Sequence, residues 1–217
     1  AAAFRSERLL LVDGETPPSP WDPIAGHYPV ADGWVQLHTN FPHHRVAATS
    51  VLGVPADADL AAVAAALGSW AAVDLEDAVA AAGGCASALR ARAAWLEHPQ
   101  AAALAPLPVP DVEGVGDAPA AGLGADGRFR VLDLTRVIAG PVAGRMLAAL
   151  GGDVLAVSAA HLPQVDSILP DAMLGKRSCA VDLRSAAGRD AFAALVADAD
   201  VVVSSYRPGA LAGLGVG

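Results

Sequence analysis

The sequence predicts an α/β protein in which a small α+β domain precedes a Rossmann-like parallel-sheet half-module, with a Pro/Gly-rich linker between them. Three observations predict this. From residue 129 on, apolar runs of strand length alternate with helical segments, as in a parallel sheet with crossover helices. Residues 105–127 contain many prolines and glycines and no apolar period, which is typical of a surface linker. Before them, two short apolar runs around Ala31-Asp32-Gly33 indicate a hairpin, followed by several helical patterns.

The stretch VLDLTRVIAGP, residues 131–141, begins the predicted parallel sheet. Its apolar start reads as a strand, its small-residue turn breaks that strand, and Pro141 stands where a helix can begin. The helix ends at Gly151-Gly152, and a second apolar run, VLAV, follows at once. Two more strands are expected at residues 178–183 and 200–205, with a helix between them that Ser185 caps. The ligands of such sheets bind at the carboxyl ends of the strands.

The expected domain boundaries follow these changes in pattern. Residues 1–25 read as the helix tail and crossing loop of a preceding module, residues 26–104 as the small α+β domain, residues 105–127 as the linker, and residues 128–217 as the half-module. Within the small domain, a helix is expected at residues 75–82 with Asp74 as its N-cap. The chain has no initiator Met and stops just after a strand, so we expect a segment of a longer polypeptide.

Charge is unevenly distributed along the chain. Residues 1–127 contain five Arg against fifteen Asp and Glu, a net charge of −10. Residues 128–217 contain nine Arg and Lys against eight Asp, a net charge of +1. An anionic ligand is therefore expected in the second part. The acidic balance, without a basic stripe interleaved with aromatic residues, argues against a nucleic-acid partner.

Other classes of function have little support in the sequence. Apolar runs fall short of the ~20 residues that a membrane helix needs, and a signal sequence is missing, so the chain reads as cytoplasmic with no membrane role. Cys85 and Cys179 lie far apart and are expected to be buried free thiols. His38, His43 and His44 do not have the spacing of metal ligands, and we expect no metal site.

Cationic and aromatic residues follow two of the expected strands. Asp182-Leu183-Arg184 and Ser205-Tyr206-Arg207 stand where parallel strands should stop, next to the turn at residues 137–141. An Arg side chain can bind phosphate oxygens with two parallel N–H donors, and a Tyr ring can stack on a purine. The turn matches neither GxGxxG nor a Walker loop, so NAD or ATP chemistry is not indicated. Taken singly, each residue is more often a solvated surface side chain, and their coincidence points to one crevice.

Four motifs in residues 129–217 resemble the family III CoA-transferases, which include formyl-CoA transferase, carnitine CoA-transferase and the α-methylacyl-CoA racemases. The motifs are VLDLTRVIAGP, GGDVLAV, GKRSCAVDL and ADVVVSSYRPGALAGLG, in the order of that family. The first part of the chain resembles the back half of such a module in AAAFRSERLLL, ADGWVQLHTN and AAGGCASALR. The resemblance therefore implies the rear of one module followed by the front of the next, within a tandem polypeptide.

The resemblance implies that coenzyme A, as an acyl-CoA substrate, binds at the front-half strand ends. The positions carried over by motif are Ile138, Ala139, Val181, Asp182, Leu183, Arg184, Ser205, Tyr206 and Arg207. Three departures stand out. Ile138 replaces a polar Gln of some members, Ser158-Ala159 replaces the usual Glu-Arg, and Gly213 replaces a frequent Arg. Losing two charge-assisted contacts, at about 1.5–3 kcal/mol each, could weaken CoA binding a hundredfold or more.

The family's activity is the transfer of CoA between an acyl-CoA and a carboxylate acceptor through an aspartyl-CoA intermediate. Its catalytic Asp lies beyond the last motif seen here, so no residue of this chain is assigned a catalytic role. Two alternatives stay open: an α-methylacyl-CoA racemase or epimerase of the same fold, and a non-catalytic, degenerate module that serves assembly. The resemblance also implies a homodimer of interlocked rings.

Overall fold

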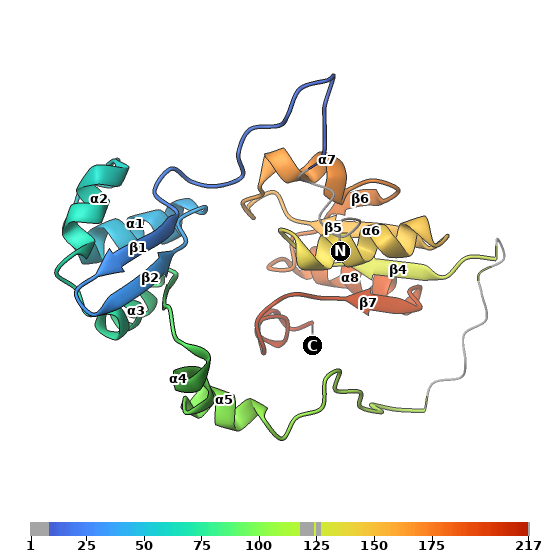
Figure 1. The fold of residues 1–217 in the computed structure, drawn as a ribbon. Helices are drawn as coiled ribbons and strands as arrows, with labels where there is room; N and C mark the ends of the chain where they lie inside the picture. Colours follow the sequence, from blue (N-terminus) through green and yellow to red (C-terminus); the bar gives the residue numbers. More distant parts are fainter. Residues whose placement is uncertain (1–8, 118–123, 125–126, 217) are drawn as a thin grey trace. The chain divides into compact units, whose positions relative to one another are not determined.

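The structure is a computed structural model that describes residues 9–117, 124 and 127–216. It divides into two compact units. The first consists of Trp21–Asp117, and the second consists of Ala1–Pro20 together with Ala118–Gly217. Figure 1 shows an antiparallel sheet with its helices in the first unit and a parallel sheet in the second. The helix tail expected at the start of the chain falls mostly on residues 1–8, outside the described residues. The boundaries expected at residues 25, 104 and 127 stay predictions.

The first unit is built on a three-stranded antiparallel sheet. Its strands are β1 (Gly26–Val30), β2 (Gly33–Leu37) and β3 (Ala86–Ala88), in the order β1-β2-β3. The expected hairpin is present, because β1 and β2 pair across the Ala31-Asp32 turn. Alternate residues of each strand are buried against the helices, as the two-residue period of a strand requires. The fully buried side chains of this core include Ile24, Val35, Leu37, Val63, Leu67, Leu75 and Val79.

Three helices cover that sheet: α1 (Pro42–Leu52), α2 (Leu60–Leu67) and α3 (Ala72–Ala81). Gly53, with φ +68°, ends α1. The N-cap expected at Asp74 is wrong, because α3 begins earlier and Asp74 lies in its first turn. The carboxylate of Asp32, from the β1–β2 turn, instead accepts a hydrogen bond from the Ala72 N–H at 2.7 Å. A cap supplied from 40 residues away leaves no local signal in the sequence.

Two short helices follow β3, namely α4 (Arg92–Leu96) and α5 (Pro99–Leu104). Neither contains a buried residue. The expectation of two buried thiols is wrong for Cys85, which is exposed, whereas Cys179 is half-buried. Burial raises the pKa of the Cys179 thiol, which lowers its reactivity. Among the described residues, no helix has the length and hydropathy needed to cross a membrane.

The second unit is a four-stranded parallel sheet, as expected. Its strands are β4 (Arg130–Asp133), β5 (Asp153–Ser158), β6 (Arg177–Ala180) and β7 (Val201–Val203). Their order is β6-β5-β4-β7, and every neighbouring pair is parallel. Along the chain, β5 pairs with one side of β4, β6 pairs with β5, and β7 then pairs with the other side of β4. This is the strand order of a doubly wound nucleotide-binding half. The reversal lies between β4 and β7.

Helices cover both faces of this sheet. α6 (Ala139–Ala149) connects β4 to β5, η3 (Asp166–Ile168) and α7 (Leu169–Ala172) precede β6, α8 (Ala186–Ala197) connects β6 to β7, and η4 (Ala212–Leu214) follows β7. Leu132 of β4 and Leu134, which directly follows β4, pack with Phe192 of α8. Asp133, between them, lies on the opposite face against Gly144 of α6. The alternation of side chains along β4 therefore separates the two helices (Figure 1).

Local signals placed most of these elements to within a few residues. Ser185 caps α8 as expected, because its hydroxyl accepts a hydrogen bond from the Gly188 N–H at 3.0 Å. α6 begins at Ala139 rather than Pro141. β6 and β7 end at Ala180 and Val203, earlier than expected. The candidate ligand residues that follow them consequently lie in loops at the carboxyl ends of the strands.

Candidate functional site

The carboxyl ends of the four strands form one edge of the parallel sheet. The backbone of Leu134 donates to the Val203 carbonyl at 2.9 Å, which continues the β4–β7 pairing to this edge. Beyond it, the Arg136 N–H donates to the Ser205 hydroxyl at 3.3 Å and joins the two following loops. Because the strand order reverses between β4 and β7, this is where a ligand crevice is expected in an open α/β sheet.

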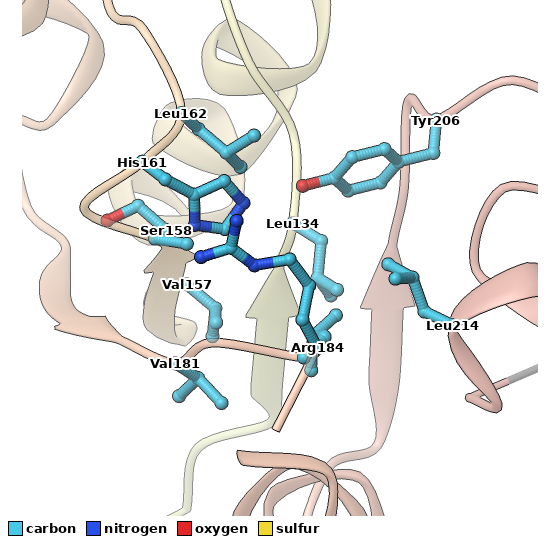
Figure 2. A pocket seen from close by; sticks show the side chains of 11 residues that line it. Leu134, Val157, Ser158, His161, Leu162, Val181, Arg184, Tyr206 and Leu214 are labelled. Carbon is cyan, nitrogen blue, oxygen red and sulfur yellow. The ribbon is translucent and has the colours of Figure 1, made fainter. Parts of the chain in front are cut away.

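A pocket of about 70 Å³ lies at this edge. The residues that line it come from the ends of all four strands and from η4: Leu134, Val157, Ser158, Ala159, His161, Leu162, Val181, Leu183, Arg184, Tyr206 and Leu214. Figure 2 shows aliphatic side chains on several sides, and polar groups that include the His161 ring, the Arg184 guanidinium and the Tyr206 hydroxyl. An apolar pocket with a few convergent polar groups is the usual form of a small-molecule site.

Arg184 is held by Asp182, two residues before it. The Arg184 Nε and Nη2 atoms donate to the two carboxylate oxygens of Asp182, each at 2.8 Å. The Arg184 N–H also donates to Asp182 at 3.1 Å. These hydrogen bonds hold the pKa of the Asp182 carboxyl far below its usual range. Because both side chains are largely exposed, at 57% and 43%, the guanidinium is oriented but still accessible to a ligand.

The backbone under this ion pair is closely packed. The Ser185 hydroxyl donates to the Asp182 carbonyl at 2.9 Å, and Arg189 of α8 donates to the carbonyls of Leu183 and Arg184 at 3.2 and 3.0 Å. A Cβ at Gly188 would lie 2.0 Å from the Asp182 carbonyl oxygen, so only glycine permits this approach. The loop after β6 therefore presents Arg184 from a defined backbone.

The β4–α6 turn is fixed by a buried network. Lys176, just before β6, donates from Nζ to the Pro141 carbonyl and to Asp133 Oδ2, each at 2.7 Å. The other oxygen of Asp133 accepts hydrogen bonds from the N–H and hydroxyl of Thr135. Val137 has φ +70°, a conformation that costs a β-branched residue of the order of 1–3 kcal/mol. The surrounding contacts thus hold the turn in a shape that its sequence does not favour locally.

The structure brings only some of the predicted ligand residues to the pocket. Val181, Leu183, Arg184 and Tyr206 line it. Of the others, Asp182 orients Arg184, and the Ser205 hydroxyl accepts a hydrogen bond from the N–H of Arg136, in the loop after β4. Ile138, Ala139 and Arg207 are not among its lining residues; Ala139 and Arg207 are exposed. The assignment of all nine to CoA binding stays a proposal.

Sequence reasoning missed one side of the pocket. Ser158, the last residue of β5, was named only as a departure from the family pattern. His161 and Leu162 of the loop after β5 and Leu214 of η4 were not singled out. The rule that selected Arg184 and Tyr206 could also have selected His161, since it stands three residues beyond the end of a parallel strand. Leu214 had no such signal, because η4 reaches the pocket through packing against the sheet.

Histidine, cysteine and carboxylate side chains are scattered over the part of the chain that the structure describes. It contains no cluster of three or more His, Cys, Asp or Glu side chains able to hold a metal ion. His38, His43 and His44 instead form part of an aromatic cluster with Trp21 and Phe41.

Comparison with known proteins finds a family match within the second unit. Residues 127–217 match the model of CoA-transferase family III. Succinyl-CoA:(R)-benzylsuccinate CoA-transferase subunit BbsE of Thauera aromatica is 40% identical over 104 residues, which cover 41% of this chain and 25% of that protein. The probable fatty acyl-CoA transferase Rv3272 of Mycobacterium tuberculosis is 37% identical over 102 residues, 41% of this chain and 26% of that protein.

A crystal structure of the Rv3272 protein covers 46% of this chain and 29% of its own, with 38% sequence identity and a TM-score of 0.38. The chain thus spans about a quarter of the length of the curated relatives named above. Residues 127–217 are therefore similar in sequence to CoA-transferase family III.

Proposed function

We propose that the polypeptide containing this chain transfers CoA between an acyl-CoA and a carboxylate, and that the pocket at the carboxyl ends of β4–β7 binds part of the CoA. The observation that carries the proposal is the match of residues 127–217 to CoA-transferase family III, together with a pocket at the edge where such sheets bind ligands. The relatives named above are CoA-transferases that differ in the acids they act on. The acyl group and the acceptor are left open here.

The chemistry proposed is a sequence of acyl transfers through an enzyme aspartate. Its carboxylate attacks the thioester carbonyl of the acyl-CoA, expels the CoA thiolate and forms a mixed anhydride. The thiolate attacks the aspartyl carbonyl, which releases the first acid and leaves an aspartyl-CoA thioester. The acceptor carboxylate repeats the two steps in the opposite sense, so that the new acyl-CoA leaves and the aspartate carboxylate is restored. No residue of this chain is assigned the role of the nucleophile.

The residues of this chain have a binding and orienting role in that scheme. Arg184 offers a fixed guanidinium to a phosphate oxygen, because Asp182 holds it in place. Tyr206 packs against the apolar cluster of the sheet and directs its hydroxyl into the pocket (Figure 2). The apolar lining excludes water from the ligand. Holding CoA while its thiolate is displaced keeps the thiolate close for the next attack.

Calorimetric titration of the full polypeptide with CoA and with acyl-CoAs tests binding. We expect saturable binding, and its absence at millimolar concentration would contradict the proposal. Treatment with acyl-CoA followed by hydroxylamine tests the mechanism, because an aspartyl thioester is converted to a hydroxamate that mass spectrometry detects. Binding without hydroxamate formation would favour the racemase, which exchanges a proton and forms no acyl-enzyme.

The second candidate is a non-catalytic module. The observation that favours it is that Arg184 is already engaged by Asp182, while Ile138, Ser158, Ala159 and Gly213 lack the polar or cationic side chains that the resemblance implies. Such a module would lose no activity when Arg184 is replaced by Ala. A fall in transferase activity of the Arg184→Ala variant would exclude it.

A further inference from the structure

His161 is a pocket residue to which neither the sequence motifs nor the family match assigns a role. It follows β5 and lines the pocket together with Arg184 and Tyr206. Its side chain is 35% exposed, and its Nδ1 lies 4.0 Å from Asp182 Oδ1. Figure 2 shows the imidazole next to the Arg184 guanidinium. The Asp182 carboxylate lies 4.0 Å from the imidazole Nδ1 and 2.8 Å from the Arg184 Nη2 atom.

The other charged side chains near His161 keep a constant charge near neutral pH. Arg184 and Asp182 form an ion pair, so together they contribute no net charge to the pocket lining. Arg136, from the loop after β4, donates to the carbonyl of Pro163 two residues beyond His161. Arg207 follows Tyr206 after β7 and is exposed. These charges stay constant near neutrality, whereas histidine is the side chain that changes charge between about pH 5 and 8.

The orientation of the imidazole suits a bridge between Asp182 and a ligand. In a protonated imidazole both nitrogens donate hydrogen bonds. With Nδ1 on the side of Asp182, the Nε2–H is the donor that can reach a ligand anion.

We propose that His161 binds an anionic group of the ligand in this pocket and that its protonation strengthens that binding. The inference rests on the proposed function, in which the ligand is CoA and the anionic group its pyrophosphate. A charge-assisted hydrogen bond at a partly exposed site corresponds to about a tenfold change in affinity. CoA affinity is therefore expected to be about tenfold higher at pH 5.5 than at pH 8.

The probe for this test is dephospho-CoA. It keeps the pyrophosphate but lacks the 3′-phosphate monoester, whose second ionisation near pH 6 would add a pH dependence of its own. Calorimetry measures its dissociation constant for the full polypeptide at pH 5.5 and pH 8. The variants are His161→Gln, which keeps a hydrogen-bonding side chain without the charge, and His161→Lys, which keeps the charge at both pH values. His27→Gln, an exposed histidine of β1 in the other unit, is the matched control.

We expect the unmodified protein and His27→Gln to bind about tenfold more tightly at pH 5.5 than at pH 8. His161→Gln should show the weaker affinity at both pH values, and His161→Lys the tighter one at both. Binding at pH 7 should also take up a fraction of a proton from the buffer. Titrations in buffers of different ionisation enthalpy measure this uptake, which should disappear in both His161 variants.

The outcomes separate the two proposals. Binding whose pH dependence or proton uptake persists in His161→Gln overturns the inference and leaves the proposed function intact. If the unmodified protein binds dephospho-CoA equally well at pH 5.5 and pH 8, the inference is also overturned and the proposed function is left intact. Absence of binding at either pH overturns both. A His161→Gln variant that fails to fold leaves the decision to His161→Lys and to the proton uptake of the unmodified protein, which must be present for the inference to stand.

Discussion

Lys176 Nζ lies 2.7 Å from Asp133 Oδ2, and the two side chains are only 1% and 2% exposed. The pair joins the carboxyl end of β4 to the segment before β6. Since Lys176 also donates to the Pro141 carbonyl, it anchors the first turn of α6 as well. The GKR and LDLT segments of the two motifs are therefore parts of one buried contact that shapes the edge of the sheet next to the pocket.

Removing one partner of this pair should be costly. In Lys176→Met, Asp133 keeps a buried charge without its cation, and breaking a buried ion pair in this way costs about 3–5 kcal/mol. The free energy of unfolding, measured with urea, should fall by that amount for the parallel-sheet unit. The double variant Lys176→Met/Asp133→Asn should lose less than the sum of the single losses, because the uncompensated charge is gone. Strictly additive losses would show that the two residues are not coupled.

Gly144 is required by the same pair. A Cβ at this position would lie 2.2 Å from Asp133 Oδ2 and 2.9 Å from Lys176 Nζ. We expect Gly144→Ala to destabilise the protein by about 2 kcal/mol or more, because the added methyl group must displace a buried, hydrogen-bonded charge. Gly213→Ala is the control, since a Cβ there meets nothing within 4 Å. Equal melting temperatures of the two variants would contradict this prediction.

Arg184 should contribute to CoA affinity through its position rather than through charge alone. Arg184→Ala is expected to weaken CoA binding about tenfold or more, as the loss of a charge-assisted hydrogen bond does. Arg177→Ala removes the same charge from the opposite end of β6, where Arg177 pairs with Asp153 at 2.7 Å. That variant should bind CoA as the unmodified protein does. Calorimetry decides, and equal weakening by both variants would indicate unspecific attraction.

The Glu76–Arg90 pair gives the first unit a stability that depends on pH. Glu76 accepts hydrogen bonds from both terminal nitrogens of Arg90, at 2.8 and 3.0 Å, and the pair joins α3 to the end of β3. These bonds lower the pKa of the Glu76 carboxyl, so its stabilising effect is present above pH 4.5 and is lost as the pH falls through the lowered pKa.

At pH 7, Glu76→Gln should therefore reduce the free energy of unfolding of that unit by about 1–2 kcal/mol. The difference from the unmodified protein should narrow when the pH is lowered to about 3. Glu97→Gln, at an exposed position after α4, serves as the control and should have little effect at either pH. A loss in Glu76→Gln that is equally large in acid would assign the effect to packing.

Several features of the fold could be predicted from local sequence. The alternation of apolar runs and helices predicted the parallel sheet, because strands buried on both faces must be apolar along their length. The capping role of Ser185 was predicted because helix capping acts within a few residues. The cap of α3 was missed because Asp32 reaches it across the fold.

The candidate site could be predicted from the sequence only in part. The sequence placed Arg184 and Tyr206 at strand ends, and the parallel order of the strands brings them to one pocket. It did not show that Asp182 holds Arg184, since a pair two residues apart can point in many directions in a loop. Nor did it indicate that Ile138 and Ala139 stand outside the pocket lining.

The sequence by itself determined the resemblance of residues 127–217 to CoA-transferase family III, the class of the sheet and the edge at which a ligand is expected, because periodicity and motifs are local properties of the chain. Tertiary structure alone decided which side chains share the pocket, that His161 faces Asp182, and that Lys176 is buried against Asp133. Lys176 and Asp133 stand 43 positions apart, and the pocket lining extends from Leu134 to Leu214, so these contacts exist only once the strands have paired and the helices have packed.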